Sequence, residues 1–202
     1  MRLVAATHNK GKLLEIRAIF GSMGFDVIGQ DEAGITVAVE ETGATFAENA
    51  VLKAKTIAQI ANAATIADDS GLCVDALGGE PGVYSARYAG EGATADMLIA
   101  KLLANMACID KPNRTAHFVS AVALCFPEGG CFTAEGRVDG RITAEPCGSG
   151  GFGYDPVFFS DELGKTFAEA NADEKNRISH RFRALSALRD TIKNALRKDI
   201  EP

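Results

Sequence analysis

Histidine and cysteine are scarce in this chain, and their spacing excludes the usual zinc sites. The three histidines, His8, His117 and His180, lie far apart in the sequence, and none of the five cysteines forms a C-x-x-C pair. We therefore expect reduced thiols in a cytoplasmic protein. Any bound metal ion should have oxygen ligands, which suits Mg²⁺, with Mn²⁺ as an alternative.

Long apolar runs and an excess of basic residues are also absent. No apolar run approaches the length of a membrane span, and the N-terminal "MRLVAATHNKGK" soon turns polar, so we expect no membrane segment and no secretory signal. The net charge of −6 argues against a nucleic-acid polymer as partner, because such a partner requires a broad basic face. A small polyphosphate needs only a local cluster of Lys and Arg, so it stays a candidate ligand.

The order of predicted elements favours an α/β protein. Strand patterns at 2–7, 25–29, 35–40 and 64–68 alternate with helix patterns at 11–25 and 45–63, the latter opening with a capping box of Thr45 and Glu48. A long loop rich in Gly and Pro at 77–94 precedes a helix that Thr94 can cap, a strand at 115–126, a hairpin at 130–145 and a last helix from 176. We expect one domain, residues 1–202, with two lobes, a central twisted mixed sheet and an active-site cleft between the lobes.

Two adjacent carboxylates, Asp68 and Asp69, follow the small apolar residues 64–67. Neighbouring residues on a strand point to opposite faces, and Ser70 and Gly71 favour a turn, so we expect the strand to end here. A carboxylate at the tip of a buried strand is costly unless it is hydrogen-bonded, ion-paired or bound to a metal ion. One Asp can cap the turn, and the pair also fits a metal or general-base role.

The stretch "ATHNKGK", residues 6–12, lies where a predicted strand gives way to a helix. Thr7, Asn9, Lys10 and Lys12 surround Gly11, and free amides at a helix start attract phosphate. The spacing is not that of a Walker loop. Lys and Gly are also common near helix starts, so an ordinary helix start explains the pattern equally well.

The stretch "GSGGFGYDP", residues 148–156, contains G-x-G-x-x-G but precedes a proline and a strand pattern rather than a helix, which excludes a dinucleotide fold. We expect a flexible loop from which Phe152 stacks on a planar ligand, with Asp155 near its edge. A β-turn with a core Phe is the alternative.

The stretch "DEKNRISHRFR", residues 173–183, places Lys175, Arg177 and Arg181 at the front of the last predicted helix. Basic residues there oppose the helix dipole, which favours a ligand, although a solvated charged face is the ordinary alternative. His180 beside Arg181 offers a donor pair for a carbonyl oxygen.

Two further acidic residues, Glu40 and Glu41, end the strand pattern at 35–40. Together with Asp69, one of these glutamates would complete a magnesium site of oxygen ligands.

Five blocks in this order, "ATHNKGK", "VEETGATFAENAVLKA", "ADDSGLCVDALGGEPGVYSARY", "GSGGFGYDPVF" and "EKNRISHR", resemble the inosine triphosphate pyrophosphatase (Ham1-like) family over nearly the whole chain. The resemblance implies a two-lobed α/β fold, a homodimer, magnesium dependence, and hydrolysis of dITP, ITP or XTP to the monophosphate and pyrophosphate. Such enzymes remove deaminated purines from the nucleotide pool. His8 stands where glycine is frequent in the family.

The resemblance also implies roles for single residues. Asp69 resembles the residue that orients and deprotonates the attacking water beside magnesium, Lys12 shares the catalytic role, and Glu40 is the second metal ligand, with Glu41 as the alternative. Asp68 supports the turn or holds a residue that contacts the metal site. The implied substrate-binding residues are Thr7, His8, Asn9, Lys10, Gly11, Lys12, Lys53, Ser70, Phe152, Gly153, Tyr154, Asp155, Lys175, His180 and Arg181. Among them, Phe152 stacks on the base, and Arg181 with His180 contacts the 6-oxo group of the base.

Two other functions are compatible with the sequence. A nucleotide sensor without catalytic activity would use the same pocket and release no pyrophosphate. A serine hydrolase built on Ser70 and His180 lacks the G-x-S-x-G elbow of that class.

Overall fold

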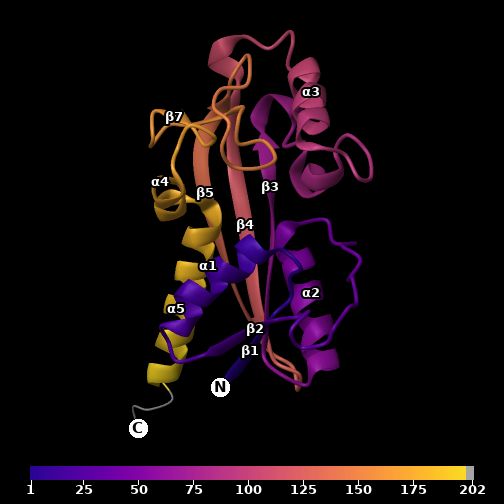
Figure 1. The fold of residues 1–202 in the computed structure, drawn as a ribbon, viewed down its shortest axis with the longest axis vertical. Helices are drawn as coiled ribbons and strands as arrows, with labels where there is room; N and C mark the ends of the chain where they lie inside the picture. Colours follow the sequence, from indigo (N-terminus) through magenta and orange to yellow (C-terminus); the bar gives the residue numbers. More distant parts are fainter. Residues whose placement is uncertain (199–202) are drawn as a thin grey trace. The chain divides into compact units, whose positions relative to one another are not determined.

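The computed structural model describes residues 1–198, in which strands and helices alternate through the first half of the chain (Figure 1). The strands are β1 (Arg2–Ala5), β2 (Asp26–Gly29), β3 (Thr65–Val74), β4 (Thr115–Cys125), β5 (Cys131–Ile142), β6 (Phe158–Ser160) and β7 (Lys165–Thr166). The α-helices are α1 (Lys10–Gly21), α2 (Phe46–Ala61), α3 (Ala95–Asn105), α4 (Ala172–Ile178) and α5 (His180–Lys198). Short 3₁₀ helices are η1 (Asp75–Leu77), η2 (Gly82–Arg87) and η3 (Lys111–Asn113). Over residues 1–198, no helix has the length and apolar character needed to cross a membrane.

The strands form a mixed sheet, as the sequence predicted. Hydrogen-bonded neighbours follow the order β2-β1-β3-β4-β5-β6-β7. β1 pairs in parallel with β2 and with β3, whereas β6 pairs antiparallel with β5 and with β7. The chain divides into two compact units. Unit 1 comprises Met1–Asp69, Ser120–Gly136 and the chain from Arg181 onward, and unit 2 comprises Ser70–Val119 and Arg137–His180. The single-domain boundaries and the cleft between lobes stay predictions.

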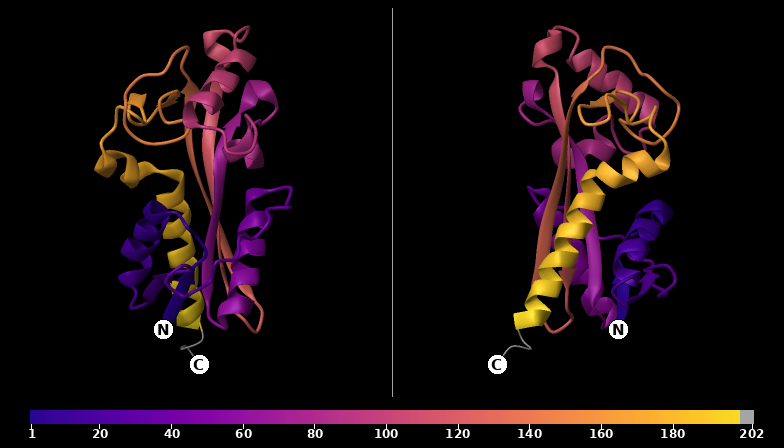
Figure 2. Two further views of the ribbon diagram at one scale, coloured as in Figure 1. Left: turned by 45° about the vertical axis from the view of Figure 1, so that its right-hand side comes forward. Right: turned by 90° about the vertical axis from the view of Figure 1, so that its left-hand side faces the viewer.

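Unit 1 has helices on both faces of its strands (Figure 2). The side chains of β1 alternate between the two faces: Leu3 and Ala5 pack with α1 and α5, whereas Val4 packs with α2. β3 alternates in the same way, because Ile66 faces α1 and α5 and Ala67 faces α2. This period of two, together with helices that are apolar on one face, produces the layered core of an α/β protein.

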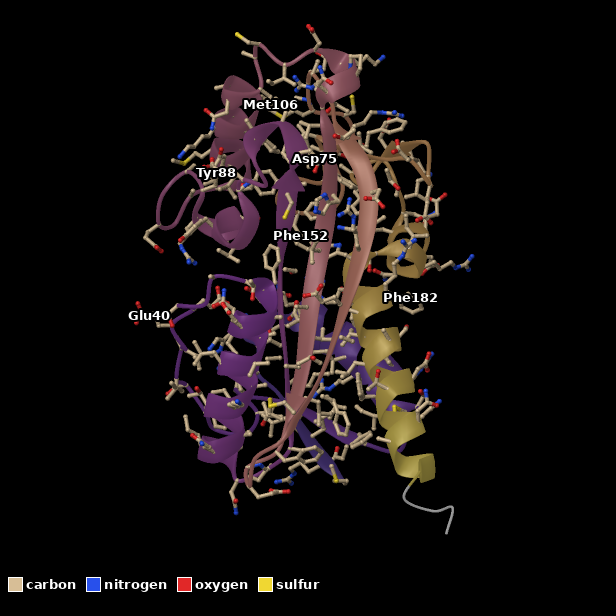
Figure 3. The ribbon with its side chains drawn as sticks, turned by 180° about the vertical axis from the view of Figure 1, so that it is seen from behind. Glu40, Asp75, Tyr88, Met106, Phe152 and Phe182 are labelled. Atoms are coloured by element: carbon tan, nitrogen blue, oxygen red, sulfur yellow. A yellow bond between two sulfur atoms is a disulfide. The ribbon has the colours of Figure 1, made fainter. Side chains whose placement is uncertain are left out.

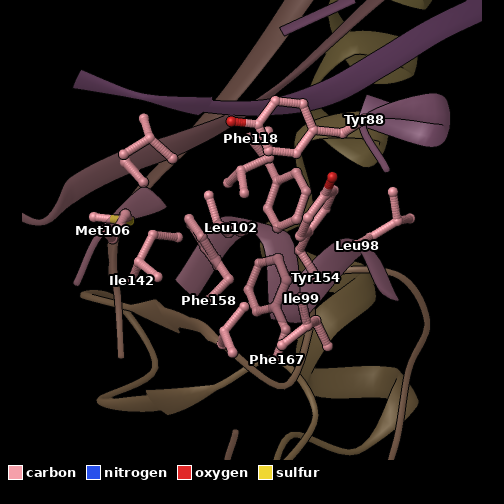
Figure 4. Packing of buried hydrophobic residues seen from close by; sticks show 14 of the residues in the cluster. Tyr88, Leu98, Ile99, Leu102, Met106, Phe118, Ile142, Tyr154, Phe158 and Phe167 are labelled. Atoms are coloured by element: carbon pink, nitrogen blue, oxygen red, sulfur yellow. The ribbon is translucent and has the colours of Figure 1, made fainter. Parts of the chain in front are cut away.

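Unit 2 buries one apolar cluster, drawn in Figure 4. α3 contributes Leu98, Ile99 and Leu102, and the aromatic rings of Phe118 and Phe158 lie 4.6 Å apart between their centroids. The buried guanidinium of Arg114 donates to four backbone carbonyl oxygens, those of Met106, Ile109, Ile142 and Thr143. These bonds attach the end of α3 to the end of β5.

Local sequence signals for helix starts are confirmed. Thr45 and Glu48 form the predicted capping box of α2, and Thr94 caps α3 by accepting from the amide of Met97. Asn9 caps α1, since its Oδ1 accepts from the amides of Gly11 and Lys12.

The prediction that the strand ends at Asp68 and Asp69 is wrong. β3 continues through both carboxylates and through Ser70 and Gly71 to Val74. The turn preference of Ser-Gly is overridden because β3 is hydrogen-bonded in the sheet between β1 and β4.

Four other predictions are corrected. The residues 35–40 alternate like a strand but form no regular structure, and residues 131–142 are one strand, β5, rather than a hairpin of their own. Lys175 lies in the last turn of a separate helix, α4, where the charge of a basic residue interacts favourably with the helix dipole.

The expectation of reduced thiols fails for two cysteines, because Cys125 and Cys131, which end β4 and begin β5, form a disulfide. Cys73 and the two remaining cysteines are free.

Candidate active site

A cavity of about 330 Å³ in unit 1 begins at the loop between β1 and α1. Its lining consists of Ala6, Thr7, His8, Asn9, Lys12, Gln30, Val37, Ala38, Val39, Glu41, Lys53 and Ile57. The structure thus brings two lysines from different helices, α1 and α2, to one cavity. Lys10 and Gly11, also predicted to bind substrate, are exposed and do not line it.

Asp69 lies on the α2 side of β3. Its Oδ2 accepts a hydrogen bond of 3.0 Å from Nδ2 of Asn49, and its Oδ1 lies 3.7 Å from Nζ of Lys53. Lys53 also forms an ion pair of 2.5 Å with Glu41. One ammonium group therefore contacts two carboxylates, Glu41 and Asp69.

Burial raises the pKa of Asp69 above its ordinary value; the charge of Lys53 opposes this change, and the negative charge of Glu41 adds to it. A free Asp, with a pKa near ~3.9, is a poor base at neutral pH. The raised pKa moves Asp69 toward the range in which a carboxylate accepts a proton effectively.

Asp68 points to the other face of β3, where α1 and α5 lie. Its Oδ2 is 3.0 Å from Nζ of Lys12 and accepts a hydrogen bond of 3.0 Å from Nε of Arg181, whose Nη1 donates to Glu15. Burial alone would raise the pKa of Asp68, but the charges of Lys12, Arg181 and Lys53 outweigh it and hold the pKa well below its usual range. Asp68 is therefore ionised at neutral pH and holds Lys12 at the cavity.

The two candidate metal ligands beside Asp69 differ in placement. Glu40 is exposed, and Figure 3 shows it on the outer side of the segment before α2. Glu41 faces Lys53 and lines the cavity. Among residues 1–198, no cluster of three or more His, Cys, Asp or Glu side chains is arranged to hold a metal ion. Glu41 and Asp69 form a pair of carboxylates, and Mg²⁺ is commonly held by one or two carboxylates together with substrate phosphates.

Phe152 and its neighbours form a platform in unit 2. Phe152 is 61% exposed, and Nζ of Lys175 lies 4.5 Å from the centroid of its ring. Lys175 is also ion-paired with the buried Asp155, which accepts from the amide of Phe152. Gly151 has a φ of +73°, and a Cβ there would lie 2.1 Å from Oδ2 of Asp155. The glycines of this loop are thus explained in part by the carboxylate packed beneath it.

The remaining predicted residues of unit 2 are placed differently. Tyr154 is buried in the core, and its hydroxyl donates to the carbonyl of Ser85. The His180 ring stacks on Phe118, with a centroid distance of 4.9 Å. Gly153 has a φ of +59°, and Ser70 is a half-buried residue of β3. The structure therefore brings Phe152, Asp155 and Lys175 together and puts Tyr154 in the hydrophobic core.

Arg181 has a different environment from the one predicted. Its guanidinium is buried against Asp68 and Glu15 in unit 1, whereas the prediction assigned it to the base. Base recognition by Arg181 stays a prediction, and a contact with the base would compete with the contacts to Asp68 and Glu15.

Sequence reasoning assigned no role to Asn49 or Gln30, both of which are buried polar residues. Asn49 lies on the apolar face of α2 with Ala50 and Ala54, and a polar residue on such a face is a signal that the sequence contained. Gln30 follows a short strand, and no sequence pattern marks its burial.

Comparison with known proteins agrees with these observations. A family model described as the Ham1 family matches residues 3–191. A dITP/XTP pyrophosphatase of Bacillus subtilis is 50% identical over 185 residues, which cover 92% of this chain and 93% of the relative. A dITP/XTP pyrophosphatase of Geobacter sulfurreducens is 49% identical over 191 residues, covering 95% of this chain and 96% of the relative.

Solved structures show the same fold. The Ham1 protein of Staphylococcus aureus has a TM-score of 0.88 and 40% identity, with 96% of this chain and 100% of that chain covered. The HAM1 protein of Coxiella burnetii has a TM-score of 0.90 and 38% identity, with 96% of this chain and 99% of that chain covered.

Proposed function

This chain belongs to the Ham1 family, and we propose on that premise that it is a dITP/XTP pyrophosphatase like its bacterial relatives. The proposed reaction converts dITP, ITP or XTP and water to the nucleoside monophosphate and pyrophosphate. The observation that carries the mechanism is the buried Asp69, whose pKa is raised and which shares Lys53 with Glu41.

Attack by water falls on the α-phosphorus, because the second product is pyrophosphate. In the proposed step, the Asp69 carboxylate orients the water and accepts its proton while the water oxygen bonds to the α-phosphorus. The bond from the α-phosphorus to the bridging oxygen breaks, and its electron pair leaves with pyrophosphate. The proton on Asp69 then passes to solvent.

Lys12 and Lys53 would stabilise the negative charge that develops on the phosphate oxygens. Both ammonium groups line the cavity and are already held by carboxylates, Lys12 by Asp68 and Lys53 by Glu41. Cations fixed before the reaction stabilise the transition state without reorganisation. We propose that Arg181 contributes by holding Asp68, which in turn holds Lys12.

Magnesium dependence is part of the proposal, and Glu41 with Asp69 would hold the ion. The paired carboxylates suit Mg²⁺, and Glu41 replaces Glu40 as the favoured ligand because Glu40 is exposed. When bound, the ion would neutralise phosphate charge and lower the pKa of a bound water. Mn²⁺ would serve as a substitute.

Phe152 is the proposed stacking platform for the purine. Its exposed ring is backed by Lys175, whose position is fixed by Asp155. Stacking is tolerant of base identity, so this platform supports binding of purines in general.

The proposal includes a homodimer and a cytoplasmic location, where free nucleotides occur. The resemblance of the loop "GGEPGVYSARY" to the dimer-forming part of the family supports the dimer, and two-fold dimers are the commonest assembly. Light scattering should therefore give twice the chain mass of 21.2 kDa. A single-chain mass at micromolar concentration would contradict the dimer.

Incubation with ITP, dITP or XTP and Mg²⁺ in water enriched in ¹⁸O tests the reaction. We expect equal amounts of pyrophosphate and monophosphate, with the label in the monophosphate. Label in pyrophosphate would contradict attack on the α-phosphorus. Tight nucleotide binding without pyrophosphate release would instead indicate a sensor.

A further inference from the structure

Gln30, immediately after β2, connects two walls of the cavity through its side-chain amide. The side chain is buried, yet it lines the cavity together with His8 and Val37. Its Nε2 donates a hydrogen bond of 3.2 Å to the carbonyl oxygen of Val37 and lies 2.7 Å from Nε2 of His8. His8 belongs to the loop before α1, and Val37 belongs to the irregular segment before α2.

The Val37 carbonyl determines the direction of every bond in this chain of contacts. A carbonyl oxygen only accepts, so the NH₂ group of Gln30 must face both Val37 and His8. Nε2 of His8 is therefore the acceptor, and the ring hydrogen is on Nδ1, which lies 2.7 Å from Oδ1 of Asp31. The two hydrogens of one amide are thus shared between the two walls.

The segment held by Gln30 has no helix or strand over residues 35–43 and carries Glu41. The amide of Ile35 donates to the Gln30 carbonyl at its start, and the Lys53–Glu41 ion pair and a hydrogen bond from the Gly43 amide to Asn49 fix its later part. Val39 packs against the apolar cluster of α2. The Gln30 side chain adds the hydrogen bond that holds the wall at the Val37 carbonyl.

We propose that Gln30 is a positioning residue for substrate binding, which holds the Val37–Glu41 wall of the cavity against the His8 loop. This inference rests on the proposed function, because the cavity is taken as the triphosphate site. Gln30 acts through His8 and Val37 and does not contact the reacting atoms.

The replacement Gln30→Glu tests this role with little change in side-chain size. The new carboxylate has no hydrogen to donate, so it would face two acceptors, the Val37 carbonyl and Nε2 of His8. We expect KM for ITP to rise about tenfold while kcat changes little, since an unpaired buried group of this kind costs about that factor. Gln59→Glu, the same change at an exposed position of α2, is the matched control and should leave KM unchanged.

The split between KM and kcat separates a positioning role from a general loss of stability. A smaller folded fraction would lower the apparent kcat and leave KM unchanged, whereas a displaced Val37–Glu41 wall raises KM.

A further variant completes the test. Gln30→Met, which lacks the amide but retains the length, should also raise KM and carries the test if Gln30→Glu does not fold. A wild-type KM in Gln30→Met, or a fall in kcat without a rise in KM in Gln30→Glu, would overturn the proposal.

Calorimetric titration with ITP and Mg²⁺ distinguishes failure of the proposed reaction from failure of the positioning role of Gln30. Absence of pyrophosphate release by the wild-type protein would refute the proposed reaction. The positioning role would still be visible as weaker ITP binding by Gln30→Glu than by wild type, and equal binding would refute it.

Discussion

Replacing Asp68 and Asp69 one at a time by asparagine should separate stability from catalysis at two adjacent positions. Both changes preserve size and remove one charge. Asp68→Asn should destabilise the fold, whereas Asp69→Asn should abolish pyrophosphate release and leave the fold as stable as wild type or more so.

The expected loss of stability in Asp68→Asn follows from the burial of Asp68. Its side chain is 2% exposed and that of Arg181 is 5% exposed, so the variant leaves a buried guanidinium short of a partner. Breaking a buried ion pair from one side costs about 3–5 kcal/mol. For a chain of this size, that cost lowers the unfolding midpoint by about 6–20 °C.

The pH dependence should have opposite signs for the two residues. The folded-state pKa of Asp68 is below its ordinary value, so its contribution is present above pH ~3.9 and is lost as the pH falls further. The folded-state pKa of Asp69 is raised, so its ionisation opposes folding once the pH rises above ~3.9. The wild-type advantage over Asp68→Asn should therefore shrink in acid, whereas Asp69→Asn should gain relative to wild type as the pH rises.

Thermal unfolding followed by circular dichroism at pH 7 and pH 3, with a pyrophosphate assay at pH 7, measures both effects. The reasoning is refuted if Asp68→Asn lies within about 1 kcal/mol of wild type at pH 7, well below the expected cost of a broken buried pair. It is also refuted if Asp69→Asn loses as much stability as Asp68→Asn, or if Asp69→Asn retains near-normal turnover.

Four other predictions concern single groups. Arg181→Ala should lower kcat/KM for ITP and ATP by a similar factor, because carboxylates hold the guanidinium; a loss confined to ITP would instead support base recognition by Arg181. Arg114→Met should lower the free energy of unfolding by about 3 kcal/mol in urea, since buried carbonyls lose their donor, and a change below about 1 kcal/mol would contradict this. Denatured protein should show three reactive thiols before reduction and five after it; five before reduction would exclude the Cys125–Cys131 bond. Phe152→Ala should raise KM about tenfold for all purine triphosphates, and an effect on one base alone would argue against simple stacking.

Signals that act over one helical turn were readable from the sequence. The capping box of Thr45 and Glu48 and the cap of Thr94 were predicted correctly because their hydrogen bonds join residues three positions apart. The resemblance of five sequence blocks also identified the family, and the alternating elements gave the α/β class. These features depend on residue order alone.

Local patterns gave wrong predictions where strand pairing decided the structure. Residues 35–40 have a strand pattern, but a strand requires a neighbour to hydrogen-bond with, and these residues have none. Ser70 and Gly71 favour a turn, yet β3 passes through them. In the first case no distant segment pairs with the pattern, and in the second the pairing of β3 with its neighbours in the sheet outweighed the local preference.

The partners of the two aspartates could be found only in the tertiary structure. The sequence placed two carboxylates beside each other and implied that they face opposite sides of a strand. Arg181, which pairs with Asp68, lies 113 residues away, and Asn49, which donates to Asp69, lies on a helix that precedes the strand. The packing of apolar side chains from the whole unit decides which helix covers which face of β3. As a result, Asp68 lies beside two cations and has a lowered pKa, whereas Asp69 is buried and has a raised pKa.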